Sequence, residues 1–65
     1  MIINNIKAKI KEKGYTCRFL AKKLELHHTE LSNICAGRRK PKTKIIRSLS
    51  RILKCKMVDL YEERN

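Results

Sequence analysis

Residues that interrupt helices are scarce in this chain of 65 residues, which contains only two glycines and one proline. Alternation of apolar and polar residues, the pattern typical of a half-buried strand, is limited to short runs such as residues 6–11. Apolar residues instead recur at spacings of three and four, which is the period of one face of an α-helix. We therefore expect an all-α fold, and the short length predicts a single domain over residues 1–65.

A continuous apolar run of about 18 residues, which a membrane span needs, is also missing. The first 14 residues do not resemble a signal peptide, because they have no continuous apolar segment followed by small residues. These absences predict a cytoplasmic protein that is not associated with a membrane. Cys17, Cys35 and Cys55 have no metal-type spacing, so we interpret them as reduced thiols that pack as small buried or half-buried residues. A redox switch is the alternative interpretation.

Acidic residues are few, since six Asp and Glu stand against 17 Lys and Arg, and the net charge is +11. A charge of that size on a small domain indicates a polyanionic partner or an anionic surface. The chain has no pair of carboxylates and no Cys/His dyad at a suitable spacing, and it is too short to enclose a pocket. We therefore predict that it is not an enzyme and that it needs no cofactor, metal or small-molecule ligand.

The apolar pattern is accounted for by five short helices. Gly14 and Gly37 are placed to end the first and the third helix, and Thr16 and Thr43 are suitable caps for the second and the fourth. A basic loop that contains Pro41 precedes the fourth helix. The expected helices cover residues 3–13, 17–24, 28–36, 44–53 and 57–63.

The second and third of these helices are separated only by residues 25–27, so they must cross rather than continue in line. Two helices that cross after a turn of three or four residues form a helix-turn-helix unit. Ala21 is small at the point where the two helices approach each other most closely. The apolar residues that fill the interior of the unit are Leu20, Ala21, Leu24, Leu26, Leu31 and Ile34.

Further residues of the same pattern follow, without a shift in spacing, over the segment from Tyr15 to Leu60. They are Thr16, Leu20, Ala21, Leu24, Leu26, Leu31, Ile34, Gly37, Arg39, Pro41, Ile46, Leu49, Leu53 and Leu60. In this register the chain resembles the lambda-repressor-like helix-turn-helix proteins, of the Cro and xenobiotic-response-element type. The resemblance implies a domain of five helices whose third helix lies in the major groove of DNA, and it implies a two-fold dimer.

In such a fold the first residues of the third helix meet the edges of the bases. Uncharged hydrogen-bonding side chains share the face of this helix that is opposite its apolar stripe. An Asn side chain can pair with adenine, and a Thr methyl group can pack on that of thymine. The predicted base contacts are His28, Thr29, Ser32 and Asn33. The two adjacent histidines have two other interpretations: exposure without a function, or a metal site formed by His27 and His28 with Cys35.

Contacts to phosphates position a reading helix of this kind. A basic segment follows the third helix directly, where the loop of the family runs beside the DNA backbone, and the first turn of the second helix also lies near it. His27 occupies a position where the family prefers a Ser or Thr cap, which commonly contacts a phosphate. The predicted phosphate contacts are Cys17, Arg18, His27, Arg38, Arg39, Lys40, Lys42, Thr43 and Lys44.

Ile10 and Cys35 form an apolar pair where many members of the family have a buried salt bridge between Arg and Glu. This exchange can be neutral or stabilising, because a buried ion pair must offset the cost of its desolvation.

Four other positions depart from the family pattern. Cys17 replaces a Gln that usually contacts the DNA backbone, and a thiol is a poor substitute. Glu25 stands where Gly commonly adopts a positive φ, which predicts a cost of about 1 kcal/mol. Lys54 replaces a frequent Gly between the last two helices. Phe19 replaces a polar residue, and its exposure there would indicate contact with another chain or packing under the C-terminus.

These observations favour a sequence-specific regulator that binds double-stranded DNA, of the small repressor type found in phages and mobile elements. We expect it to act as a homodimer, with Met57, Val58 and Tyr61 either at the dimer interface or completing the monomer core. A second hypothesis is an antitoxin or another partner-dependent regulator, to which a partner protein docks through Phe19 and the C-terminal apolar residues. A third is a cationic module that coats RNA or an anionic membrane without sequence preference.

Overall fold

The computed structural model describes residues 2–63, so Met1, Arg64 and Asn65 of the predicted domain lie outside the described residues. Five helices are present, as predicted. In chain order the elements are β1 (Ile2–Asn4), α1 (Ile6–Glu12), α2 (Cys17–Lys23), α3 (His28–Cys35), α4 (Thr43–Leu53), α5 (Met57–Leu60) and β2 (Tyr61–Glu63). None of the helices in residues 2–63 is long and apolar enough to cross a membrane.

All five helices contribute to one apolar core. No polar or charged residue among those described is buried. Burial of each large aliphatic side chain contributes about 1.5–3 kcal/mol, so this core is the main source of stability. Its buried residues are Ile6, Ile10, Leu20, Ala21, Leu31, Ile34, Ile46, Leu49, Leu53 and Leu60.

The helix-turn-helix unit forms at α2 and α3, as the sequence predicts. Thr16 caps α2, because its side-chain oxygen accepts a hydrogen bond from the backbone N–H of Phe19 at 3.1 Å. The turn closes where the backbone N–H of Leu26 donates to the carbonyl of Ala21 at 2.8 Å. Glu25 has a φ of 58°, the left-handed conformation expected at this position. The turn therefore keeps its geometry without a glycine, at a cost of about 1 kcal/mol.

The two ends of the described chain pair as strands, which the sequence analysis did not predict. Ile3 was expected in the first helix but lies in β1, and the last helix ends at Leu60 instead of continuing to Glu63. The strands are antiparallel, with Ile3 opposite Glu62. A strand of three residues is too short to show a period of two, and its partner is almost the whole chain away. The local pattern therefore could not reveal this pairing.

Asn4 explains why the first helix begins three residues later than expected. Its side-chain oxygen accepts a hydrogen bond from the backbone N–H of Ile6 at 3.1 Å, which starts α1 there. Its side-chain amide donates to the carbonyl of Ile34, near the end of α3, at 2.8 Å. The Asn4 side chain thus joins β1, α1 and α3 at one point.

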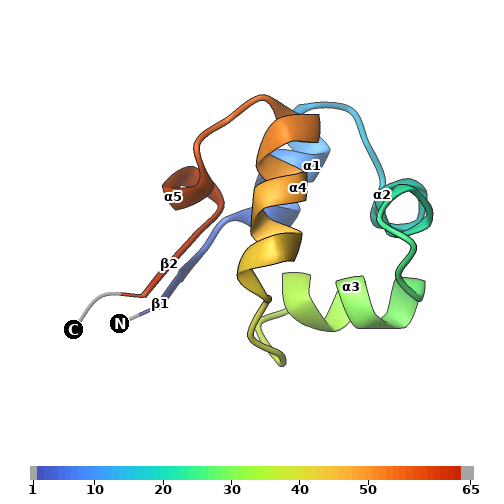
Figure 1. Ribbon diagram of the computed structural model, residues 1–65, viewed down its shortest axis with the longest axis horizontal. Helices are drawn as coiled ribbons and strands as arrows, with labels where there is room; N and C mark the ends of the chain where they lie inside the picture. Colours follow the sequence, from blue (N-terminus) through green and yellow to red (C-terminus); the bar gives the residue numbers. More distant parts are fainter. Residues whose placement is uncertain (1, 64–65) are drawn as a thin grey trace.

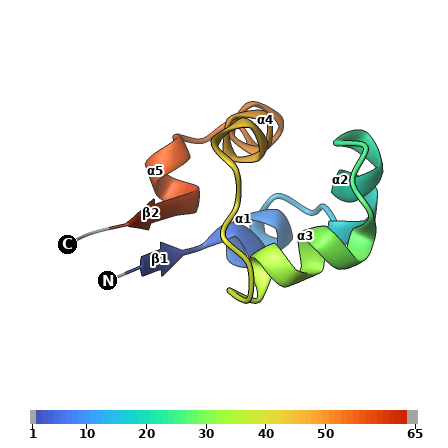
Figure 2. The ribbon, with the colours of Figure 1, turned by 60° about the horizontal axis from the view of Figure 1, so that its bottom comes forward.

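The elements are arranged so that α3 is held along one side of the molecule. The strand pair lies at one end, α2 lies at the opposite end, and α4 stands between them (Figure 1). Figure 2 shows β1 alongside β2, and α2 and α3 meeting at a steep angle. This arrangement leaves the outer face of α3 uncovered by any other helix.

We predict that Asn4→Ala lowers the free energy of unfolding by about 1–3 kcal/mol, because it removes two hydrogen bonds and leaves the Ile34 carbonyl without this partner. Asn5→Ala is the matched control, since Asn5 is exposed and its side chain makes no cap hydrogen bond. Urea unfolding followed by circular dichroism measures both. Equal stability of the two variants would contradict the role given to Asn4.

Candidate nucleic-acid interface

His27 determines where α3 begins. Its Nδ1 accepts a hydrogen bond from the backbone N–H of Thr29 at 3.3 Å, so a histidine serves as the helix cap. Because Nδ1 is the acceptor, the proton of the neutral imidazole lies on Nε2. The rings of His27 and His28 stack, with their centroids 5.3 Å apart. The cap therefore leaves the Nε2–H of His27 free to donate to an external acceptor.

The outer face of α3 holds all four predicted base-contact residues. His28, Thr29 and Ser32 are exposed and Asn33 is half-buried, whereas the apolar residues of the helix face the core. None of the four side chains carries a formal charge when histidine is neutral. The structure thus brings the predicted residues together on one uncharged surface that can donate and accept hydrogen bonds.

Asn33 is held in place by the segment that follows α3. One guanidinium nitrogen of Arg38 donates to the side-chain oxygen of Asn33 at 3.3 Å. The backbone N–H of Arg38 also donates to the carbonyl of Asn33 at 2.9 Å. An amide oxygen has two lone pairs, so the Asn33 side chain can still accept a second hydrogen bond and donate from its NH₂ group. Arg38, predicted as a phosphate contact, is therefore also a support for Asn33.

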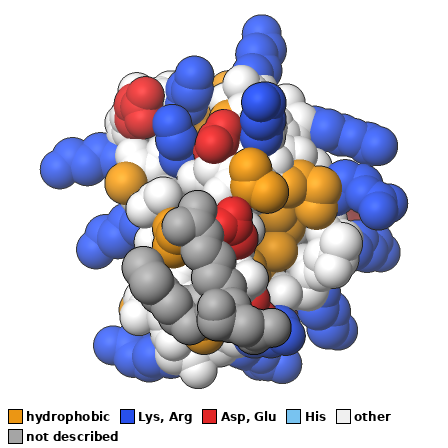
Figure 3. All heavy atoms as spheres, turned by 90° about the vertical axis from the view of Figure 1, so that its left-hand side faces the viewer, with side chains coloured by type: hydrophobic (Ala, Val, Ile, Leu, Met, Phe, Trp, Pro, Cys, Tyr) orange, Lys and Arg blue, Asp and Glu red, His pale blue; other side chains and the backbone are white. Residues whose placement is uncertain are grey.

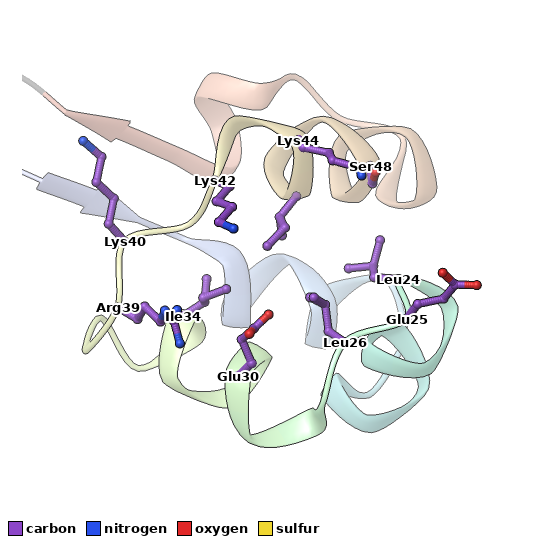
Figure 4. A pocket seen from close by; sticks show the side chains of 11 residues that line it. Leu24, Glu25, Leu26, Glu30, Ile34, Arg39, Lys40, Lys42, Lys44 and Ser48 are labelled. Carbon is purple, nitrogen blue, oxygen red and sulfur yellow. The ribbon is translucent and has the colours of Figure 1, made fainter.

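Several predicted phosphate contacts surround a hollow of about 310 Å³ between α3 and the start of α4. Arg39, Lys40, Lys42 and Lys44 line it, and Figure 4 shows Glu30 extending from α3 toward the same space. Apolar side chains of the α2–α3 turn, α3 and α4 also line the hollow. They are Leu24, Leu26, Ile34 and Ile45. The cations of the loop and of α4 are thereby gathered beside Glu30 and Ile34 of α3.

The start of α4 differs by one residue from the expectation. Thr43 was predicted as its cap, but Lys42 occupies the cap position and Thr43 is the first helical residue. The Lys42 side chain makes no cap hydrogen bond, which leaves the first backbone N–H groups of α4 without a side-chain partner. N–H groups at the start of a helix favour anions. Thr43 and Lys44, both exposed, lie at this position.

Lys40 points away from the other loop cations. Its Nζ lies 2.8 Å from a carboxylate oxygen of Glu63 in β2, and the hydroxyl of Tyr61 donates to the same oxygen at 3.2 Å. Figure 4 shows the Lys40 side chain extending toward the strands. The hydrogen bond and charge of Lys40 lower the pKa of Glu63, and those of Glu63 raise the pKa of Lys40. Lys40 is thus committed to the strand pair in this structure.

The two predicted phosphate contacts at the start of α2 differ in their exposure to solvent. Arg18 is exposed. Cys17 is half-buried, and its Sγ lies 3.7 Å from the Sγ of Cys35 at the end of α3. The thiol of Cys17 is therefore directed at the interior of the helix-turn-helix unit, whereas the sequence analysis placed it beside the DNA backbone.

Phe19 is exposed, as expected, but it is not isolated. Its ring stacks on that of Tyr15 with centroids 5.6 Å apart, and the Nζ of Lys23 lies 5.7 Å from the centre of the Phe19 ring. About 45% of Phe19 remains accessible. The aromatic pair thus covers part of the α2 surface while keeping an apolar face toward solvent.

A metal site of the two histidines with Cys35 was one interpretation of the sequence. Within residues 2–63 no group of three or more His, Cys, Asp or Glu side chains is arranged to hold a metal ion. The half-buried thiol of Cys35 instead contacts Cys17.

A family model described as helix-turn-helix matches residues 6–60 of the chain. The chain belongs to the helix-turn-helix family. A crystal structure of a protein from Bacteroides fragilis, provisionally described as DNA-binding, has the same fold with a TM-score of 0.88. The two sequences are 24% identical, and the match covers 95% of this chain and all of the other. No curated protein sequence matches this helix-turn-helix chain.

Sequence reasoning missed three contacts around the interface of this helix-turn-helix protein. These are the bond from Asn4 to the end of α3, the Lys40–Glu63 ion pair, and the contact between Cys17 and Cys35. The first two depend on the unpredicted strands. For the third, a signal was present, because both cysteines occupy positions where the family usually has polar residues.

We predict that His27→Ala lowers the free energy of unfolding by about 1 kcal/mol, because the first turn of α3 loses its cap. His27→Ser should restore most of the loss, since a serine hydroxyl can accept the same hydrogen bond. His28→Ala is the control, because no hydrogen bond in the described structure involves the exposed His28 side chain, and it should change stability by less than about 0.5 kcal/mol. Chemical unfolding measures all three, and a serine variant as unstable as the alanine variant would refute the capping role.

Proposed function

We propose that this helix-turn-helix protein is a transcriptional regulator that binds a palindromic operator in double-stranded DNA as a homodimer, as small repressors of phages and mobile elements do. The observation that carries the proposal is the uncharged, hydrogen-bonding outer face of α3, which we call the reading face and which consists of His28, Thr29, Ser32 and Asn33. Arg38 is bonded to Asn33 at one end of this face, and further cations of the loop and of α4 lie near α3. A net charge of +11 supplies attraction to the DNA backbone, and the absence of charge on the reading face leaves discrimination to hydrogen bonds and shape.

Each residue of the reading face has a chemical role in this proposal. Asn33 pairs with the N6 and N7 atoms of an adenine, while Arg38 fixes the plane of its amide. The Thr29 methyl group packs on the methyl group of a thymine. His28 and Ser32 donate to or accept from base edges in the same groove. A helix of this kind reads only a few base pairs, so we expect two copies on half-sites about 34 Å apart.

Cations on both sides of the reading face contact phosphates in this proposal. Arg18 and the Nε2–H of His27 lie on the α2 side, and Arg39, Lys42 and Lys44 lie on the α4 side, with the free backbone N–H groups at the start of α4. If six phosphates are neutralised per monomer, log K falls with log[salt] at a slope of roughly −5. Lys40 is not included, because it is paired with Glu63.

The end of the molecule formed by β1, β2 and α5 is the proposed dimer interface. Residues 57–63 contain three of the six acidic residues and no Lys or Arg, so this segment adds no positive charge to an interface between two chains of net charge +11. Ile2 is 63% and Val58 56% exposed there, and Met57 and Tyr61 are partly exposed. Figure 3 shows hydrophobic side chains gathered on this end, with Lys and Arg around them.

Selection from a random library of DNA duplexes tests the proposal. We expect enrichment of one palindromic sequence, and a failure to enrich any sequence over the starting pool would reject it. A protein that coats nucleic acid without preference would bind RNA and unselected DNA with equal affinity. The same binding measurements at several salt concentrations give the number of phosphates neutralised.

We predict that Asn33→Ala relaxes the preference at one base pair in each half-site and weakens binding of the selected duplex by about 1–3 kcal/mol. Arg39→Ala is the contrasting variant, because loss of a phosphate contact should weaken binding to all sequences alike and make the salt slope shallower by about 1. Titrations against the selected duplex and its single-base variants distinguish the two effects. Equal losses on every duplex for Asn33→Ala would show that this residue does not read a base.

We predict that Val58→Lys weakens dimer formation at least tenfold, because it places a charge in an apolar contact between two cationic chains. Phe19→Lys is the matched control, since it adds the same charge to another exposed apolar position at the α2 end. Sedimentation velocity without DNA, and the stoichiometry on the selected duplex, measure the assembly. A Val58→Lys protein that dimerises as well as the Phe19→Lys protein would place the interface elsewhere.

A further inference from the structure

Two of the three cysteines face each other across the helix-turn-helix unit. Cys17 is the first residue of α2 and Cys35 is the last residue of α3, and their Sγ atoms are 3.7 Å apart. The residues between them form α2, the turn and α3. The pair therefore lies where the two ends of the unit meet, next to Arg18 in the chain on one side and two residues before Gly37 on the other.

The two thiols lie close enough to be joined in a disulfide. Both are half-buried, so a small molecule can reach them while the surrounding core restricts their motion. Burial and the neighbouring Cys17 raise the pKa of Cys35 to about 12, so Cys35 stays protonated near neutral pH and Cys17 is the sulfur that reacts first with an oxidant. Formation of a disulfide requires the two Sγ atoms to close by about 1.7 Å, to the usual bond length of about 2.04 Å. Rotation of the two side chains with a small shift of the helix ends supplies that distance.

We propose that Cys17 and Cys35 form an oxidisable dithiol site whose substrate is a two-electron oxidant of the peroxide class, and that its conversion to a disulfide weakens DNA binding. The effect on DNA rests on the proposed function. The formation of the disulfide does not depend on it.

The reaction proceeds in two balanced steps. The Cys17 thiol loses its proton, its sulfur attacks one oxygen of hydrogen peroxide, the O–O bond breaks, and the leaving hydroxide takes up a proton to become water, which gives a sulfenic acid. The Cys35 sulfur then attacks the Cys17 sulfur, forming the S–S bond and breaking the S–O bond, and a second water leaves with the proton of Cys35. Two thiols and one peroxide thus give one disulfide and two waters.

The disulfide alters the positions of the groups on both sides of the reading face. Closing the two sulfur atoms draws the start of α2, which carries Arg18, toward the end of α3, which leads into Arg38 and Arg39. We expect this shift to change the spacing between the phosphate-contacting groups on the two sides of the groove and so to weaken DNA binding. Cys55 lies in the connection between α4 and α5 and has no such contact with another cysteine in the described chain, so it serves as an internal reference.

The first experiment treats the full-length protein with a small excess of hydrogen peroxide, blocks the remaining thiols with N-ethylmaleimide and digests it with trypsin. We expect the fragments 14–18 and 24–38 to be joined, with a loss of two hydrogens from the intact protein, and Cys55 to carry the alkyl group. Dithiothreitol should separate the fragments. Alkylation of all three cysteines after treatment, or a disulfide that involves Cys55, would overturn the proposal.

The second experiment measures binding to the duplex recovered by selection, before and after oxidation. We expect the Kd of the wild-type protein to rise at least threefold and to recover with dithiothreitol. Cys35→Ala should bind as the reduced protein does and lose the response to this mild oxidation, whereas Cys55→Ala should keep it. An unchanged Kd with joined fragments would overturn the effect on DNA. If the reduced protein selects no duplex, the proposed function fails, and the joined fragments alone decide the dithiol site.

Discussion

The packing of α2 against α3 is the contact on which the rest of the structure depends. Leu20 and Ala21 from one helix and Leu31 and Ile34 from the other are all buried. Ala21 keeps the two backbones close, and the left-handed Glu25 turns the chain between them. Because this crossing is fixed, the residues of α3 that do not pack inward must form one outward surface. The strands, α4 and α5 serve to close the other side of the same core.

The helices and their crossing could be predicted from the sequence because their signals are local. Apolar spacing, the Thr16 cap and the short turn all lie within a few residues of the feature that they specify. The strands at Ile2–Asn4 and Tyr61–Glu63 could not be predicted, since each is defined only by a partner far along the chain. The Thr43 cap was wrong by one residue, which is the usual uncertainty of a helix end.

The candidate interface was predictable to a similar degree. Helical spacing places these residues on one face of α3, so it could be predicted from the sequence that they lie together. The orientation of individual loop side chains was not, because Lys40 and Arg38 are directed by Glu63 and Asn33. A run of cations in sequence is thus divided by the structure into groups with different partners. Which cation remains available to an external anion is determined by such side-chain contacts, and the spacing of the cations in the sequence does not reveal them.

The absence of polar residues from the core has a consequence for how this protein can diversify. Since the ten buried core residues within residues 2–63 are all aliphatic, no buried polar side chain among them constrains the identity of the outward residues of α3. Substitution at those positions leaves the interior intact, and interchange of aliphatic residues of similar volume leaves the surface intact. The core positions and the outward positions of α3 can therefore change independently. A single fold of this kind can then carry outer faces with different binding preferences.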